Sequence, residues 1–298
     1  MIALEEDLRQ RKNTLLEFKD VTLRVLNYLP HVLTGEKTKN NYKLHISNSA
    51  GLTKALRPIN QILFIYDPVK FENDFNQLID LFCKMRIRNN EYTGAELFLI
   101  DSVLYTIQQA IGCGFDLLSA SNSGRKHVGN RFEELMRAVF NELEISNTRT
   151  VLKIPYVTDD GTKIYACEMD LILSPYKAVK STSTQLDENE IVVSVKTTSK
   201  DRMGKMFIDK ILLEKFVKHK QKVIGIFLND VQRSKDNNTS FTLVSNLFMV
   251  YTQFLTELEG VYYLDPPPNA HKSPFNKHMA PFSQLVTKDI WKLLPSQF

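Results

Sequence analysis

An apolar strand that ends in a lysine is the feature that most constrains this chain. Residues 191–195 read Ile-Val-Val-Ser-Val, which predicts a buried strand, and Lys196 follows where packing gives no reason for a cation. Lys200-Asp201-Arg202 then places a cation, an anion and a cation in succession, and Asp209 follows on an expected helix over 203–221. The segment 196–222 carries nine cations and three anions, a local surplus larger than the +4 of the whole chain. Any function that depends on positive charge, such as binding an anionic partner, is therefore expected at residues 196–222 rather than over the whole surface.

A carboxylate lies inside another apolar strand. Asp159-Asp160-Gly161 predicts the turn of a hairpin, and Asp170 lies in its returning strand between Met169 and Leu171. Burying an unpaired carboxylate costs several kcal/mol, so Asp170 is expected to be paired or to bind a cation.

The order of elements predicts an α/β fold. From Gly129 onward the pattern is helix, hairpin, strand, helix, strand, helix, strand, which is typical of a mixed central sheet flanked by helices. Helical periodicity over 3–29, 71–86 and 93–111 makes the first third mostly helical, with Pro30 expected to end the first helix. A polar loop with short strands is expected over 35–60. We therefore divide the chain into a helical region, 1–118, and a core, 119–298.

These residue types suit phosphodiester hydrolysis. The reaction needs carboxylates that hold Mg²⁺ and a cation that orients the nucleophile or stabilises the transition state. Asp170 and Lys196 lie on strands that can be neighbours. A third carboxylate would come from Asp209 or from Glu134, which is only slightly preferred over Glu133 on the helix before the hairpin. Because Mg²⁺ keeps several waters, two or three carboxylates suffice.

An aspartate followed by a strand that ends in x-x-Lys resembles the PD-(D/E)xK nuclease superfamily. The chain departs from that pattern with Ser194 two residues before the lysine and with Met169 before Asp170. It is similar instead to the type II restriction endonucleases grouped with EcoRII, SsoII and NgoMIV, in which that acid has moved to the following helix. The resemblance implies that Lys196 is the catalytic lysine, that Asp170 and the relocated Asp209 bind metal, and that Glu134 adds a third acid.

The same resemblance gives Lys200-Asp201-Arg202 a role in reading CC/GG base pairs. Arg and Lys donate to guanine O6 and N7, and Asp accepts from cytosine N4. An anion on a phosphate-binding surface would repel the backbone, so this order favours base reading. Lys205 is expected to contact phosphates.

The resemblance implies a Mg²⁺-dependent type II restriction endonuclease acting on double-stranded DNA at a short palindrome that contains CC/GG. A palindrome implies a homodimer or a dimer of dimers, with the helical region supplying dimer contacts and an arm around DNA. Two alternatives stay open: an inactive DNA-binding protein with a nuclease fold, which Ser194 favours, and a structure-directed repair or recombination nuclease. Three cysteines without metal-binding spacing and no apolar window of membrane-spanning length predict a cytoplasmic protein, and the resemblance implies one of prokaryotic type.

Overall fold

The computed structural model describes residues 2–49, 52–87, 91–118, 121–200, 202–234, 238–241 and 245–294. Its N-terminal part holds five helices and three strands: α1 (Leu4–Arg9), α2 (Leu15–Val32), β1 (Leu33–Lys39), β2 (Tyr42–Ser49), β3 (Leu52–Asn60), α3 (Pro68–Arg86), α4 (Gly94–Leu117) and α5 (Ser121–Glu142). The part that follows contains β4 (Ser146–Thr158), β5 (Gly161–Ser174), β6 (Ile191–Lys196), α6 (Met203–Val217), β7 (Lys222–Phe227), β8 (Val231–Ser234), β9 (Asn238–Phe241), α7 (Ser245–Phe254) and β10 (Gly260–Tyr263). The chain closes with short elements: 3-10 turns at Pro268–His271 and Phe275–Lys277, β11 (Met279–Pro281), α8 (Phe282–Gln284), a π turn (Leu285–Asp289) and α9 (Ile290–Leu293).

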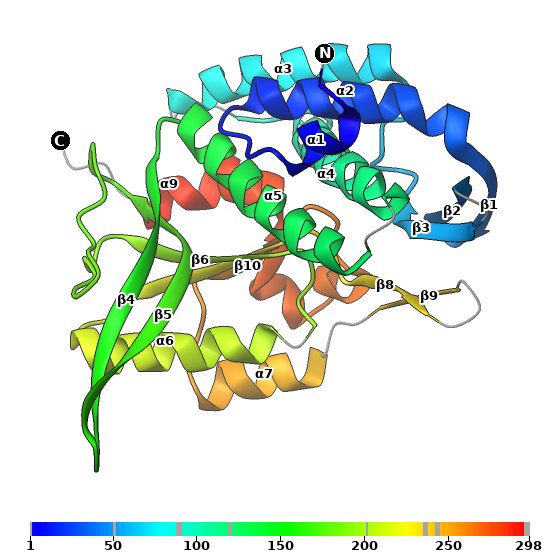
Figure 1. The fold of residues 1–298 in the computed structure, drawn as a ribbon. Helices are drawn as coiled ribbons and strands as arrows, with labels where there is room; N and C mark the ends of the chain where they lie inside the picture. The colour runs from blue at the N-terminus through cyan, green and yellow to red at the C-terminus, as the bar shows by residue number, and fades with distance from the viewer. Residues whose placement is uncertain are drawn as a thin grey trace.

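The central sheet has the strand order β11-β10-β7-β6-β5-β4. The pairs β4–β5 and β5–β6 are antiparallel, whereas β6–β7, β7–β10 and β10–β11 are parallel. The N-terminal helices lie over one face and α6 and α7 over the other, while the β4–β5 hairpin projects beyond the sheet (Figure 1). The predicted mixed sheet flanked by helices, with a helical N-terminal region, is therefore confirmed.

Alternation along β6 divides the hydrophobic core between the two faces. Ile191, Val193 and Val195 pack into the cluster that also contains the N-terminal helices. Val192 belongs to the other cluster, with Phe207 of α6. Successive side chains of a strand point to opposite faces, so Ser194 shares the face of Val192, toward α6.

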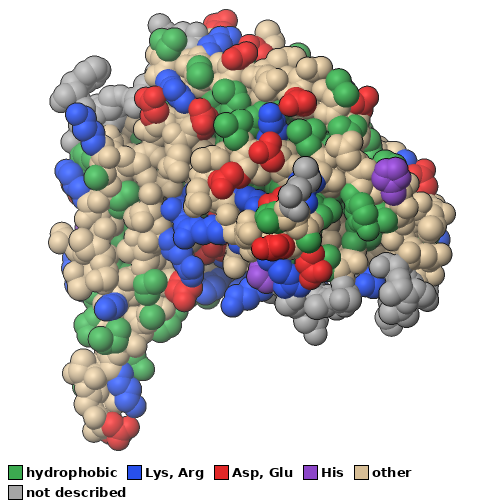
Figure 2. All heavy atoms as spheres, turned by 45° about the horizontal axis from the view of Figure 1, so that its top comes forward, with side chains coloured by type: hydrophobic (Ala, Val, Ile, Leu, Met, Phe, Trp, Pro, Cys, Tyr) green, Lys and Arg blue, Asp and Glu red, His purple; other side chains and the backbone are tan. Residues whose placement is uncertain are grey.

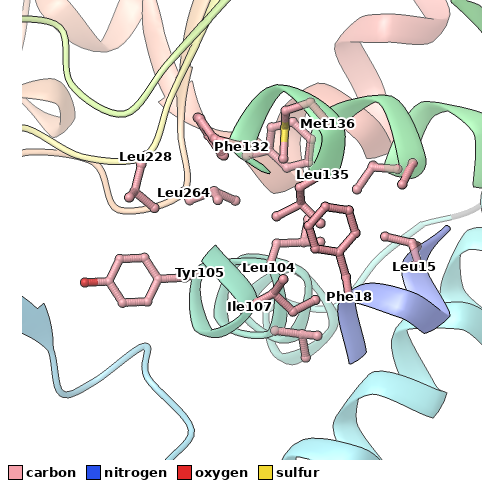
Figure 3. Packing of buried hydrophobic residues seen from close by; sticks show 14 of the residues in the cluster. Leu15, Phe18, Leu104, Tyr105, Ile107, Phe132, Leu135, Met136, Leu228 and Leu264 are labelled. Atoms are coloured by element: carbon pink, nitrogen blue, oxygen red, sulfur yellow. The ribbon is translucent and has the colours of Figure 1, made fainter. Parts of the chain in front are cut away.

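Helix α4 forms the centre of the first core. Thr93 begins it with a capping box closed by Glu96, as the sequence predicts. Its residues Leu104 and Ile107 pack toward Phe132 and Leu135 of α5 (Figure 3). The helix is long and apolar enough to cross a membrane, which corrects the expectation that no such window exists, but 83% of that window is buried inside the protein. This burial is what a central core helix requires.

Local boundaries differ from several sequence expectations. The first helix is two helices, because the chain is extended at Gln10, and Pro30 lies inside α2 rather than ending it. The segment expected to be a polar loop with short strands, 35–60, is mostly strand, because β1, β2 and β3 form a three-stranded sheet. The polar and basic residues 121–126 favour a loop by sequence, but in the structure they begin α5. Helix α6 ends at Val217 rather than at residue 221, and Lys218 after it adopts a left-handed conformation. The β8–β9 hairpin had no clear sequence signal.

Replacing Leu104 with Ala is expected to lower the free energy of unfolding by about 2–5 kcal/mol, because the fully buried side chain would leave a cavity in the core. Denaturant titration followed by circular dichroism measures this change. Leu16→Ala on the exposed side of α2, where the side chain is 60% exposed, is the matched control and should change stability by less than about 1 kcal/mol. Equal losses in both variants would contradict the central place of α4.

Candidate active site

The site forms where strands β5 and β6 stop pairing. Their last described ladder pair is Leu171 with Val193. Beyond it, the carboxylate of Asp170 accepts the backbone N–H of Val195 at 2.9 Å, and the hydroxyl of Ser194 lies 3.5 Å from the same oxygen. The Asp170 carboxylate thus takes the place of a backbone acceptor and satisfies the Val195 amide where the ladder between the two strands ends.

The ammonium of Lys196 lies between two carboxylates. Its Nζ is 2.6 Å from Asp170 Oδ2 and 3.2 Å from Glu133 Oε1. All three side chains are partly buried, with 15% exposure for Asp170 and 21% for Glu133. Burial, followed by the charge of Asp170, raises the pKa of Glu133 above its usual value, and the charge of Lys196 opposes that rise. Two carboxylates facing one ammonium leave an excess negative charge that a further cation would neutralise.

Glu133, rather than the preferred Glu134, reaches this cluster from α5. Glu134 instead accepts the backbone N–H of Lys12 at 3.0 Å and pairs with Arg131 at 2.9 Å, so it fastens the segment between α1 and α2 to α5. The geometry therefore does not support Glu134 in the site. A signal was present in the sequence: Arg131 and Glu134 are three residues apart, the spacing of an ion pair along one helix.

Asp209 lies on α6 near the same carboxylate. Asp170, Ser194 and Asp209 line one small pocket between the sheet and this helix. Asp209 also forms an ion pair with Lys205, one turn earlier. This arrangement brings Asp209 to the side of the sheet on which Ser194 lacks a carboxylate.

Three of the predicted DNA-binding residues, Lys200, Arg202 and Lys205, are described and follow Lys196 along the chain. Arg202 is exposed at the N-terminus of α6, and Lys200 is also exposed and donates to Gln232 Oε1 of β8 at 3.3 Å. Asp201 lies outside the described residues. Lys205 is directed to Asp209. Figure 2 shows Lys and Arg side chains gathered where the projecting hairpin meets the body of the molecule.

The donors suit a hard divalent cation. Within the described ranges no group of three or more His, Cys, Asp and Glu side chains is arranged around one metal position. Asp170 and Glu133 nevertheless both contact the ammonium of Lys196, so their oxygens could bind a metal cation at or near that position. Mg²⁺ accepts such a partial set because waters complete its shell.

Comparisons with known proteins support the architecture. The sequence matches no known protein-family profile and no curated protein. Among solved structures, the chain is similar to the type IIP restriction endonuclease Kpn2I, with a TM-score of 0.72, 16% identity, and coverage of 94% of this chain and 91% of that one. A complex of restriction endonuclease PspGI with substrate DNA is also similar, with a TM-score of 0.41, 12% identity, and coverage of 74% of this chain and 92% of that one. The Kpn2I likeness shows that the chain has the fold of a restriction endonuclease.

Glu133→Gln and Glu134→Gln separate the two neighbouring acids. The first should weaken Mn²⁺ binding at least about tenfold, measured by titration calorimetry, because it removes a negatively charged oxygen from the cationic position. The second should leave Mn²⁺ affinity unchanged but lower the free energy of unfolding by about 1–3 kcal/mol, since Arg131 and the Lys12 amide lose their charged acceptor. The opposite pattern would place Glu134 in the site.

Proposed function

We propose that this chain is a Mg²⁺-dependent type II restriction endonuclease that cuts double-stranded DNA at a short palindromic site containing CC/GG. The observation that carries the proposal is the ammonium of Lys196 held between Asp170 and Glu133 at the diverging end of β5 and β6. The likeness to the fold of Kpn2I supports it. A homodimer or dimer of dimers would match a palindrome. Such an endonuclease would act in the cytoplasm of a prokaryotic-type cell.

The proposed roles follow from the contacts. Asp170, Glu133 and, across the pocket, Asp209 would hold the cation, which when bound would lower the pKa of a water and neutralise charge on the phosphate. Lys196 would orient the attacking water and stabilise the charge that develops on the phosphate. Its contacts with both acids hold its ammonium beside the proposed cation site. Glu133 takes the place that the sequence prediction gave to Glu134, and Asp209 keeps its predicted role.

Specificity is assigned to the turn after β6. Lys200 and Arg202 are exposed and can donate to guanine O6 and N7, and Asp201 is proposed to accept from cytosine N4. Lys205 would add a phosphate contact, so affinity should fall steeply with salt.

Incubation of plasmid DNA of known sequence with Mg²⁺ tests the proposal. Discrete fragments whose ends map to sites sharing CC/GG are expected, with none in EDTA. Lys196→Ala should slow cleavage at least about 100-fold while DNA binding in Ca²⁺ persists, because phosphate contacts elsewhere remain. A smear without preferred ends would favour the structure-directed nuclease.

Asp209→Asn tests whether α6 supplies the acid that Ser194 lacks. Cleavage should slow by at least about tenfold while binding in Ca²⁺ changes little, because the carboxylate lines the pocket of Asp170. Glu214→Gln is the matched control on the same helix, since Glu214 contacts Lys220 and the Gln221 amide. A fully active Asp209→Asn protein would remove this role. If the parent retards DNA without cutting it, the inactive DNA-binding alternative that Ser194 motivates replaces the proposal.

A further inference from the structure

A fully buried carboxylate lies behind the turn that is assigned to base reading. Asp230 follows β7 and has no exposed surface. Its Oδ1 accepts the backbone N–H of Ser199 at 2.7 Å and the hydroxyl of Thr198 at 3.2 Å. Its Oδ2 accepts the hydroxyl of Ser199 at 2.7 Å and that of Tyr263 at 2.8 Å. These donors from two segments explain how the protein accommodates a carboxylate that would otherwise be costly to bury.

The residues held by Asp230 in turn hold the exposed cations. The carbonyl of Ser199 accepts the N–H groups of Arg202, at 3.0 Å, and Met203, at 2.9 Å, which begins α6. The hydroxyl of Thr198 accepts the N–H of Lys200 at 3.3 Å. The backbones of both exposed cations are therefore one hydrogen bond away from a residue bound to Asp230.

The same segment is tied to the catalytic strand end. The N–H of Leu228 donates to the carbonyl of Lys196 at 3.2 Å, and Asp230 follows two residues later. Beyond it, Gln232 accepts from Lys200 at 3.3 Å. The segment 228–232 thus contacts the catalytic lysine's backbone at one end and the turn at the other.

A neighbouring buried aspartate ties the N-terminal sheet to this region. Asp265 accepts the hydroxyl of Tyr42 at 2.9 Å and the side-chain amide of Asn60 at 2.8 Å. Its own N–H donates to the carbonyl of Leu228 at 2.9 Å. The segment that carries Asp230 is therefore hydrogen-bonded to the turn through Ser199 and to Asp265 through Leu228. A turn that must be placed precisely needs such a rigid support.

We propose that Asp230 is a positioning residue that sets base discrimination by fixing the turn of Thr198, Ser199, Lys200 and Arg202 relative to Lys196. It acts through Ser199 and Thr198 and has no described contact with Asp170, Glu133 or Lys196. This inference rests on the proposed function, because discrimination presupposes that the turn reads bases. Discrimination by side-chain donors depends on their placement, so loosening the turn should harm recognition more than the cleavage step.

The test compares Asp230→Asn with Asp101→Asn. Asp101 is the matched control, because it binds Ser283 through the same pair of contacts, N–H to Oδ1 at 2.8 Å and hydroxyl to Oδ2 at 2.6 Å, but joins α4 to α8. Each substitution replaces one carboxylate oxygen by an amide that cannot accept. Ser199→Ala is a milder second variant, which loses only the hydroxyl contacts.

Two readouts are measured on each full-length protein. The first is the ratio of cleavage rates on the parent's site and on duplexes with one base pair changed. Asp230→Asn should lower this ratio at least about tenfold, with a smaller change in the rate on the parent's site, and Ser199→Ala should lower it less. The second is amide hydrogen exchange in peptides spanning 197–206, which should accelerate about tenfold or more in Asp230→Asn. Asp101→Asn should change neither readout.

The outcomes separate this inference from the proposed function. The positioning role is overturned if Asp230→Asn leaves the ratio of cleavage rates unchanged. It is also overturned if Asp101→Asn lowers that ratio as much as Asp230→Asn does. Unchanged exchange over 197–206 overturns it as well, whether or not the protein cuts DNA. A parent that cuts no DNA overturns the proposed function and the discrimination role together, whereas accelerated exchange in Asp230→Asn would still show that Asp230 holds the turn.

Discussion

The arrangement of the site depends on one ammonium shared by two carboxylates. Lys196 Nζ contacts Asp170 from the neighbouring strand and Glu133 from α5, so a sheet and a helix are joined at one charged position. Because both acids are partly buried, each needs a nearby cation, and Lys196 alone does not balance both. We propose that this charge deficit would favour binding of a further cation, which is why we interpret the cluster as chemical rather than structural.

The sheet topology places these groups beside the proposed recognition turn. Strands β6, β7 and β10 are parallel, so their carboxyl ends meet at one edge of the sheet. Lys196 ends the first, Asp230 follows the second, and Asp265 follows the third. Ligands of open α/β sheets bind at such an edge. Catalysis and recognition would therefore be linked by a short run of backbone, with buried aspartates keeping it in place.

The sequence predicted the fold more completely than the site. Strand periodicity, the Asp-Asp-Gly turn and the Thr93 capping box are local signals, and the structure contains the hairpin, the parallel strands and α4 accordingly. The choice between Glu133 and Glu134 depends on how α5 is rotated against the sheet, which tertiary packing decides. The role of Asp230 depends on the meeting of segments 31 residues apart, and no local pattern marks it.

The anomalous scattering of Mn²⁺ soaked into a crystal of the protein would show whether the Lys196 cluster is a cation site. We expect a peak about 2 Å from a carboxylate oxygen of Asp170, with Glu133 or Asp209 as a further ligand and with Lys196 moved away from the position it now shares. Mn²⁺ bound elsewhere, with the Lys196 contacts to both carboxylates intact, would instead make the cluster a structural ion pair.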